Sequence, residues 1–128
     1  MTNFIDLLGR IFISSVFLIS GYNKFNNFDA TVNWMEGFGV SGLLLWPTIL
    51  LEILLPIFVI IGYQVKISAI LLALFSIATA VIFHSDFSNQ MQVIALLKNL
   101  GLAAGFMFIA IHGTRDWTIE KKKKYVRL

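Results

Sequence analysis

The sequence predicts an all-α membrane protein: an antiparallel bundle of four transmembrane helices with a short interfacial helix in the first loop. Of its 128 residues, 58% are hydrophobic and only 13% are charged, whereas soluble domains carry about a quarter charged residues. Mean hydropathy is +0.82. Four stretches also reach the length of about 20 apolar residues that a membrane-spanning helix needs.

The same composition excludes several other classes of protein. A small domain has much surface and little interior, so this apolar content does not fit a soluble enzyme, a disordered segment or a nucleic-acid-binding module. The chain has no cysteine, which excludes disulfides, thiol catalysis, iron–sulfur ligation and thiolate zinc sites. We therefore expect membrane lipid, and no nucleic acid, among its partners.

The four expected spans follow one another along a single domain of residues 1–128. We expect the first span to be a permanent helix, because Asp6 offsets Arg10 near the N-terminus and no A-x-A-like signal cleavage site follows. Trp46-Pro47 lies near the start of the second span, where a proline is harmless in the first helical turn. The spans cover residues 4–22, 43–63, 65–84 and 91–112.

The link between the first two spans is long enough to hold a further short helix. We expect this helix over residues 28–36, with Asp29 as its N-cap. Trp34 suits the boundary between the bilayer and water. The predicted helix therefore lies at the membrane surface or partly covers the end of the bundle.

Basic residues predict the orientation of the chain in the membrane. Seven of them fall on one side: Lys66, Arg115, Lys121, Lys122, Lys123, Lys124 and Arg127. The opposite side has only Lys24. Lysine and arginine accumulate on the cytoplasmic side of membrane proteins. We therefore expect a multi-pass protein of the bacterial inner membrane with both termini, and the basic tail of residues 113–128, in the cytoplasm.

Polar residues inside the spans are the candidate functional residues. A charge within the bilayer costs several kcal/mol, so it is usually paired or lines a cavity. Arg10, Glu52, Lys98 and Asn99 lie within spans, and Lys24 and His84 lie near span ends. At 1.5 Å per residue, Glu52 lies roughly 13 Å from Leu43 at its outer end. By the same rise, Lys98 lies roughly 12 Å below the outer surface and Arg10 roughly 18 Å below it. We expect the charges of Arg10, Glu52 and Lys98, with the amide of Asn99, to meet in one layer.

Helical periodicity assigns one polar or small-residue face to each span. Small residues allow helices to approach closely in lipid. The four predicted faces are Arg10, Ser14, Phe17, Gly21 and Lys24; Thr48, Glu52, Pro56 and Tyr63; Ala69, Ala73, Ser76, Ala80 and His84; and Lys98, Gly101, Gly105, Phe108 and His112.

Two interpretations of the charged layer stay open. It is either a ligand site for a quinone or another anionic or carbonyl-bearing head group, with Lys24 and His84 at its outer mouth, or a buried ion-pair network that determines which helices pack together. Neither histidine has a second histidine and a carboxylate at the spacing that a metal site needs. We therefore expect no metal.

The order and spacing of several short motifs resemble the DoxX family of small bacterial membrane proteins, over nearly the whole chain. These motifs are Leu8-Gly9-Arg10 with Phe17, Gly21-Tyr22-Asn23-Lys24-Phe25, Leu51-Glu52-Ile53-Leu54-Leu55-Pro56, Gly62-Tyr63, Phe83-His84, Leu97-Lys98-Asn99-Leu100, and His112-Gly113 with Trp117. The family takes its name from a subunit of a thiosulfate:quinone oxidoreductase.

The resemblance implies a membrane subunit of a redox-linked complex, though not necessarily an enzyme. The chain has no intrinsic cofactor motif, so a redox centre would come from another membrane or cytoplasmic subunit, or from a bound quinone. Two alternatives stay open: a non-enzymatic scaffold or assembly subunit, and a small transporter, for which a homo-oligomer would build the path.

Overall fold

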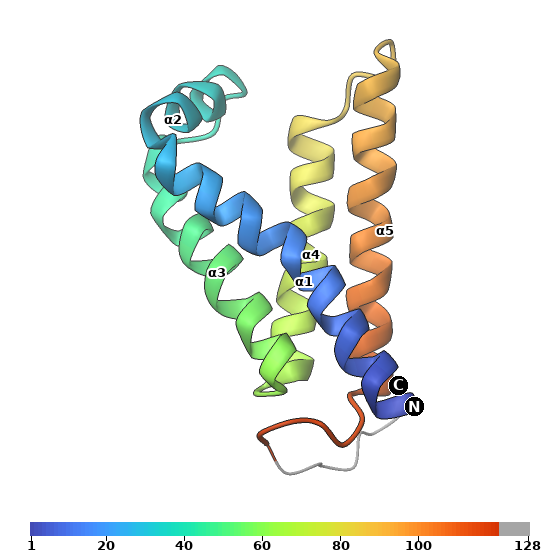
Figure 1. Cartoon of the computed structure of the whole chain (residues 1–128). Helices are drawn as coiled ribbons and strands as arrows, with labels where there is room; N and C mark the ends of the chain where they lie inside the picture. The colour runs from blue at the N-terminus through green and yellow to red at the C-terminus, as the bar shows by residue number, and fades with distance from the viewer. Residues whose placement is uncertain (121–128) are drawn as a thin grey trace.

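The structure, a computed structural model, describes residues 1–120, which form helices and contain no strand (Figure 1). Its elements are α1 (Thr2–Asn26), α2 (Phe28–Gly37), the 3-10 turn η1 (Gly42–Leu44), α3 (Leu45–Ile61), α4 (Val65–Phe83) and α5 (Gln90–His112). The basic residues of the tail from Lys121 onward lie outside the described part.

Four helices are long and apolar enough to cross a membrane: Thr2–Asn26, Gly42–Ile61, Val65–Phe83 and Gln90–His112. They confirm the four predicted spans. The first differs most, because α1 continues to Asn26 and not to about Tyr22. The start of α1 and the end of α5 lie at one end of the molecule, here named the terminal end, and α2 lies at the other, here named the α2 end (Figure 1).

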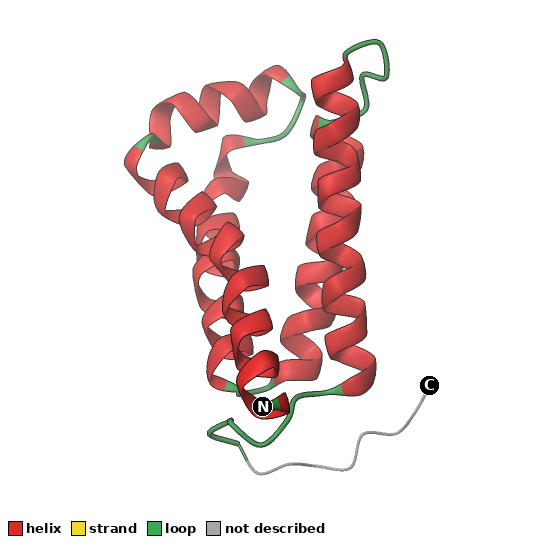
Figure 2. Ribbon diagram, turned by 45° about the vertical axis from the view of Figure 1, so that its right-hand side comes forward, coloured by secondary structure: helices red, strands yellow, loops and turns green. Residues whose placement is uncertain are grey.

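The helices pack mainly as two pairs, α1 with α3 and α4 with α5, with α3 and α4 joining the pairs (Figure 2). The central core contains the rings of Phe17, Phe75 and Phe106, whose centroids are 6.2 Å apart for Phe17 and Phe75 and 5.6 Å apart for Phe17 and Phe106. Small side chains on α4 let α5 approach closely, since Ala69 and Ala73 are buried.

The predicted faces agree with burial on the first and third spans. The buried residues of α1 are Arg10, Ser14, Phe17 and Gly21, and those of α4 include Ala69, Ala73, Ser76 and Ala80. On α3, Glu52 and Pro56 are buried as expected, whereas Tyr63, which lies just beyond the end of this helix, is exposed.

The predicted face of α5 is wrong. The buried residues of this helix are Ala103, Phe106 and Ala110, whereas Lys98, Gly101, Phe108 and His112 are exposed. We expected the polar and glycine residues of this helix to face inward. Instead, the face with Ala103, Phe106 and Ala110 packs in the core with the small residues of α4.

Helix α2 is present where the first link predicts it, but Asp29 is not its cap. The helix begins at Phe28 with Asn27 in the cap position, and Asp29 lies in its first turn. Met35 packs with Leu45 and Ile49 of α3. The indole of Trp34 stacks on the ring of Phe83 from α4, with 4.4 Å between ring centroids. Thus α2 bridges the two helix pairs at the α2 end.

Candidate functional site

The buried charges form two separate clusters at opposite ends of the bundle. The arginine cluster, at the terminal end, contains Arg10, Asp6 and the carbonyl groups of Val59, Ile60 and Trp117. The glutamate pocket, toward the α2 end, contains Glu52, Lys24, Asn99 and His84 among its lining residues. Arg10 and Lys24 are separated by roughly 21 Å along α1, at 1.5 Å per residue.

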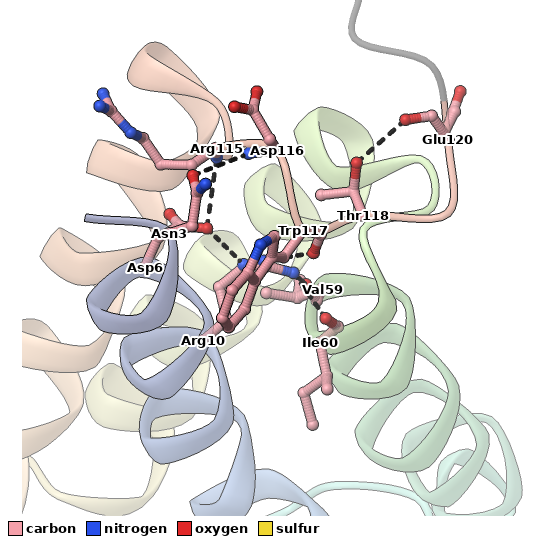
Figure 3. Close-up of polar contacts among 10 residues, drawn as sticks. All are labelled: Asn3, Asp6, Arg10, Val59, Ile60, Arg115, Asp116, Trp117, Thr118 and Glu120. Atoms are coloured by element: carbon pink, nitrogen blue, oxygen red, sulfur yellow. Dashed lines mark hydrogen bonds and ion pairs between the residues drawn. The ribbon is translucent and has the colours of Figure 1, made fainter. Parts of the chain in front are cut away.

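In the arginine cluster, every guanidinium nitrogen of Arg10 has an acceptor (Figure 3). Its Nε donates to Asp6 Oδ2 at 2.9 Å, one turn earlier on α1. Its Nη1 donates to the carbonyl oxygens of Val59 and Ile60 at 3.1 and 2.5 Å. Its Nη2 donates to the Trp117 carbonyl at 2.8 Å. One buried side chain thus joins α1, the end of α3 and the segment after α5.

Further contacts hold that last segment against the terminal end. The backbone N–H of Arg115 donates to Asp6 Oδ2 at 3.2 Å, and the N–H of Ile119 donates to the Ile61 carbonyl at 2.9 Å. Gly62 follows α3 with a φ of 80°, and a Cβ there would lie 2.3 Å from Thr118 Cβ. Only glycine suits both the backbone conformation and this close approach.

The prediction that Arg10 reaches Glu52 is therefore wrong. The sequence estimate measured depth from Tyr22, but α1 extends to Asn26, which places Arg10 roughly 24 Å from the end of its helix at 1.5 Å per residue. Carbonyl groups at the end of α3, which have no helical partner, accept the hydrogen bonds of the guanidinium instead.

In the glutamate pocket, the partner of Glu52 is Lys24. Lys24 Nζ lies 2.6 Å from Glu52 Oε1 and also donates to Ser20 Oγ at 2.7 Å. The Glu52 side chain is 1% exposed and that of Lys24 is 25% exposed. The second carboxylate oxygen, Glu52 Oε2, is buried and has no hydrogen-bond partner. The pocket thus contains one strong ion pair and one unused buried acceptor.

Close helix packing brings this pair together. A Cβ on Gly21 would lie 2.9 Å from Ile53 Cδ1 and 3.2 Å from Glu52 Cβ, so the glycine allows α1 to touch α3 directly. Lys24, almost one turn further along α1, then lies beside Glu52. The predicted face from Arg10 to Lys24 already included both Gly21 and Lys24. The pairing of Lys24 with Glu52 was missed because the first span was expected to end at Tyr22.

Lys98 does not pair with Glu52, contrary to expectation. It is exposed on α5 and lines a second hollow between α1 and α5, outside the glutamate pocket. The rotation of α5 about its own axis turns Lys98 away from the glutamate pocket. Its neighbour Asn99 faces inward and donates from Nδ2 to Thr79 Oγ1 at 3.2 Å.

The glutamate pocket encloses a cavity of about 320 Å³, at the lower end of the range for ligand sites. Its remaining walls are mainly apolar and aromatic, and include Phe17, Phe75, Leu102, Trp34 and Phe83. His84 also lines it, and its Nδ1 lies 2.9 Å from Gln92 Oε1. Of the six candidate residues, the structure therefore brings together Glu52, Lys24, Asn99 and His84.

Chemically, the glutamate pocket offers hydrogen-bond donors and a carboxylate beside an apolar slot. An ammonium has three N–H donors, two of which Lys24 uses. A side-chain amide has two N–H donors, one of which Asn99 uses. Within residues 1–120, no three His, Asp or Glu side chains are grouped to hold a metal ion. The site suits a small, flat molecule with carbonyl oxygens.

The fold and this pocket define a small helical membrane protein with a polar pocket between its spans. The sequence profile of the DoxX family matches residues 5–85, a range that contains Arg10, Lys24, Glu52 and His84. The chain belongs to the DoxX family.

Two proteins of Escherichia coli (strain K12) are similar over most of their lengths. The chain is 31% identical to Inner membrane protein YqjF over 115 residues, covering 90% of this chain and 88% of that protein. It is 28% identical to Inner membrane protein YphA over 123 residues, covering 91% of this chain and 88% of that protein. No solved structure matches the chain.

Proposed function

We propose that this protein resides in the bacterial inner membrane and binds a quinone in the glutamate pocket, as the membrane subunit of a redox-linked complex. The observation that carries the proposal is Glu52, which is almost fully buried, lines the cavity and keeps Oε2 without a partner. A buried unpaired acceptor is costly unless a donor reaches it, and a ring hydroxyl of the reduced form of a quinone is such a donor.

A quinone head group fits the donor set of the pocket. Its ring carries carbonyl acceptors on opposite edges, which match the third N–H of Lys24 and the second N–H of Asn99. The apolar walls of Phe17, Phe75 and Leu102 suit the faces of the ring. When bound, a quinone supplies electron acceptance coupled to proton uptake.

The residues of this chain then bind the ring and orient it in the pocket. Lys24 and Asn99 hold the ring by its carbonyl oxygens. Glu52 Oε2, which Lys24 leaves without a partner, accepts a hydrogen bond from a ring hydroxyl when the ring is in its reduced form. His84, at the end of α4, marks the outer mouth of the pocket.

The orientation of the protein follows from the same basic residues as before. The terminal end holds Lys66 and Arg115, and the cytoplasm is the side that such residues favour. The relatives in E. coli are named inner membrane proteins. With the terminal end in the cytoplasm, the glutamate pocket lies in the outer half of the bilayer and α2 lies along the outer surface.

The fluorescence of Trp34, which lines the pocket, offers a direct test. A variant with Trp46→Phe and Trp117→Phe keeps Trp34 as its single tryptophan. We expect a membrane quinone to quench this fluorescence saturably. Lys24→Met should weaken binding by about tenfold, equivalent to about 1.4 kcal/mol, because a carbonyl loses its charged donor.

Lys66→Met is the matched control, since it removes a lysine at the terminal end and leaves the pocket intact. It should bind quinone as the parent protein does. If the folded parent shows no saturable quenching, the quinone proposal is wrong and the scaffold alternative gains. If Lys24→Met and Lys66→Met bind equally well, the ligand does not occupy the glutamate pocket.

A further inference from the structure

We infer that the gap between α1 and α5 is a lateral portal that opens the glutamate pocket to the hydrocarbon of the bilayer. Through it, an apolar molecule passes from the lipid to the pocket, and the chain of a bound ligand extends outward. The identity of this ligand as a quinone rests on the proposed function; the existence of the portal does not.

The first support is a shared wall. A hollow of about 640 Å³ between α1 and α5 is lined by Ile13, Val16, Lys98, Asn99, Gly101 and Leu102. Three of these residues, Val16, Asn99 and Leu102, also line the glutamate pocket. The two spaces therefore adjoin across these side chains.

The glycines of α5 show where the two helices part. A Cβ on Gly105 would lie 2.5 Å from Ile13 Cδ1, so α5 and α1 touch there. One turn earlier, a Cβ on Gly101 would meet no atom within 4 Å. The helices thus meet at Gly105 and diverge toward the α2 end, which leaves the side of the pocket open at Gly101.

Lys98 places a charged hydrogen-bond donor at this opening. It is the charged residue among those that line the hollow, and it is exposed within an apolar span. A charge at such a position is costly against lipid and usually lines a path or cavity. At the portal, its ammonium offers a hydrogen bond to a polar head group that passes from the bilayer toward Lys24 and Asn99.

The sizes of the two spaces indicate what the portal carries. The glutamate pocket, at about 320 Å³, accommodates a ring but not the long apolar chain of a membrane quinone. The chain needs a route out of the pocket, and Ile13, Val16 and Leu102 form an apolar route toward the lipid. The occupant of the portal is therefore the apolar chain of the ligand whose ring lies beside Glu52.

The absence of cysteine from the chain allows a clean test by thiol labelling. Thr48 lines the glutamate pocket, so Thr48→Cys places one thiol inside it. In proteoliposomes, a maleimide with a long alkyl chain should label this thiol from the lipid phase. Adding Gly101→Phe should slow labelling on the order of tenfold, because one bulky ring obstructs the route of approach.

Two controls separate obstruction from damage. Gly9→Phe makes the same change at another exposed helical glycine with no atom within 4 Å of its Cβ position. Helical side chains point toward the N-terminus, so this ring lies away from the portal and labelling should not slow. Leu74→Cys, on the exposed surface of α4, should react at the same rate with or without Gly101→Phe if the variant is folded.

Equal labelling of Thr48→Cys with and without Gly101→Phe would overturn the portal. A selective slowing supports it, whether or not Trp34 responds to quinone. Where quinone quenches Trp34, Gly101→Phe should weaken the equilibrium binding of a long-chain quinone on the order of tenfold and spare that of a tailless one, since only the chain still occupies the gap once the ring is bound. Loss of both quinones equally would contradict placement of the chain in this gap.

Discussion

The two buried charged residues of this bundle, Arg10 and Glu52, differ in how completely they are satisfied. Both are at most 2% exposed. Every guanidinium nitrogen of Arg10 donates to an acceptor, and these hydrogen bonds join three segments that are distant in the sequence. Glu52 has one partner, Lys24, and one oxygen without a partner beside a cavity. We therefore propose a structural role for the first and a binding role for the second.

The difference also separates the two interpretations that the sequence left open. A ligand site and an ion-pair network were alternatives for one charged layer, but the bundle has a cluster suited to each role. The arginine cluster closes the terminal end, where Figure 3 shows the contacts of Arg10. The glutamate pocket lies where the helix pairs are bridged by α2.

The largest expected effect comes from breaking the arginine cluster. Arg10→Met should destabilise the protein by about 4 kcal/mol, because three carbonyl groups lose their side-chain donor and Asp6 loses its ion-pair partner, although it keeps the N–H of Arg115. Thermal unfolding in detergent measures this change. Arg10→Lys should rescue little, since a compact ammonium does not match acceptors spread over three segments.

The control for that prediction is Arg115→Met. Arg115 is exposed, and its side chain donates to Thr2 Oγ1 at 3.2 Å. Loss of an exposed contact should change stability by about 0.5 kcal/mol or less. Equal destabilisation by the two substitutions would contradict the structural role of the arginine cluster.

The next effect concerns the ion pair of the glutamate pocket. Lys24→Met should destabilise the protein by about 2 kcal/mol, because it leaves a buried carboxylate unpaired. Glu52→Gln should cost less, since Lys24 is partly exposed and retains Ser20 as an acceptor. The double variant should be more stable than the sum of the single effects predicts. Strict additivity would show that the two side chains do not interact.

A third effect concerns the packing that makes the pair. Gly21→Leu should destabilise the protein by about 2 kcal/mol, because overpacking forces α1 away from α3. Gly9→Leu, at an open position on the same helix, should be neutral or slightly stabilising, since leucine favours helix more than glycine does. Chemical denaturation of both variants tests the difference, and a stable Gly21→Leu protein would count against the tight contact.

The smallest effect is expected at Lys98. Lys98→Met should change stability by about 0.5 kcal/mol or less, because this exposed residue holds no helix pair together. Its effect should add to that of Glu52→Gln without coupling. A large coupling energy between these two residues would restore the single charged layer that the sequence suggested.

The sequence predicted the spans well because long apolar runs and a 3.6-residue period have few alternative explanations in a chain this hydrophobic. It also identified Glu52, Lys24, Asn99 and His84 as candidates. It misplaced Arg10 because helix ends are poorly defined by composition, and α1 continues through polar residues to Asn26.

The rotation of α5 was the other failure, and its cause is different. Its polar residues, Lys98 and Asn99, are adjacent and point in different directions, so polarity alone did not select the inward face. The match between Phe106 and the small residues of α4 did select it. The fit between two helix surfaces depends on both helices, so it cannot be predicted from the sequence of one helix alone.

We propose that a ligand binds beside Glu52 and that none binds in the arginine cluster. An experimental structure of the protein in lipid nanodiscs with saturating membrane quinone tests it most directly. We predict density for a ring in the glutamate pocket, within hydrogen-bond distance of Lys24 Nζ, with the chain leaving between α1 and α5. A pocket without ring density, or a ring bound against Arg10, would contradict the account.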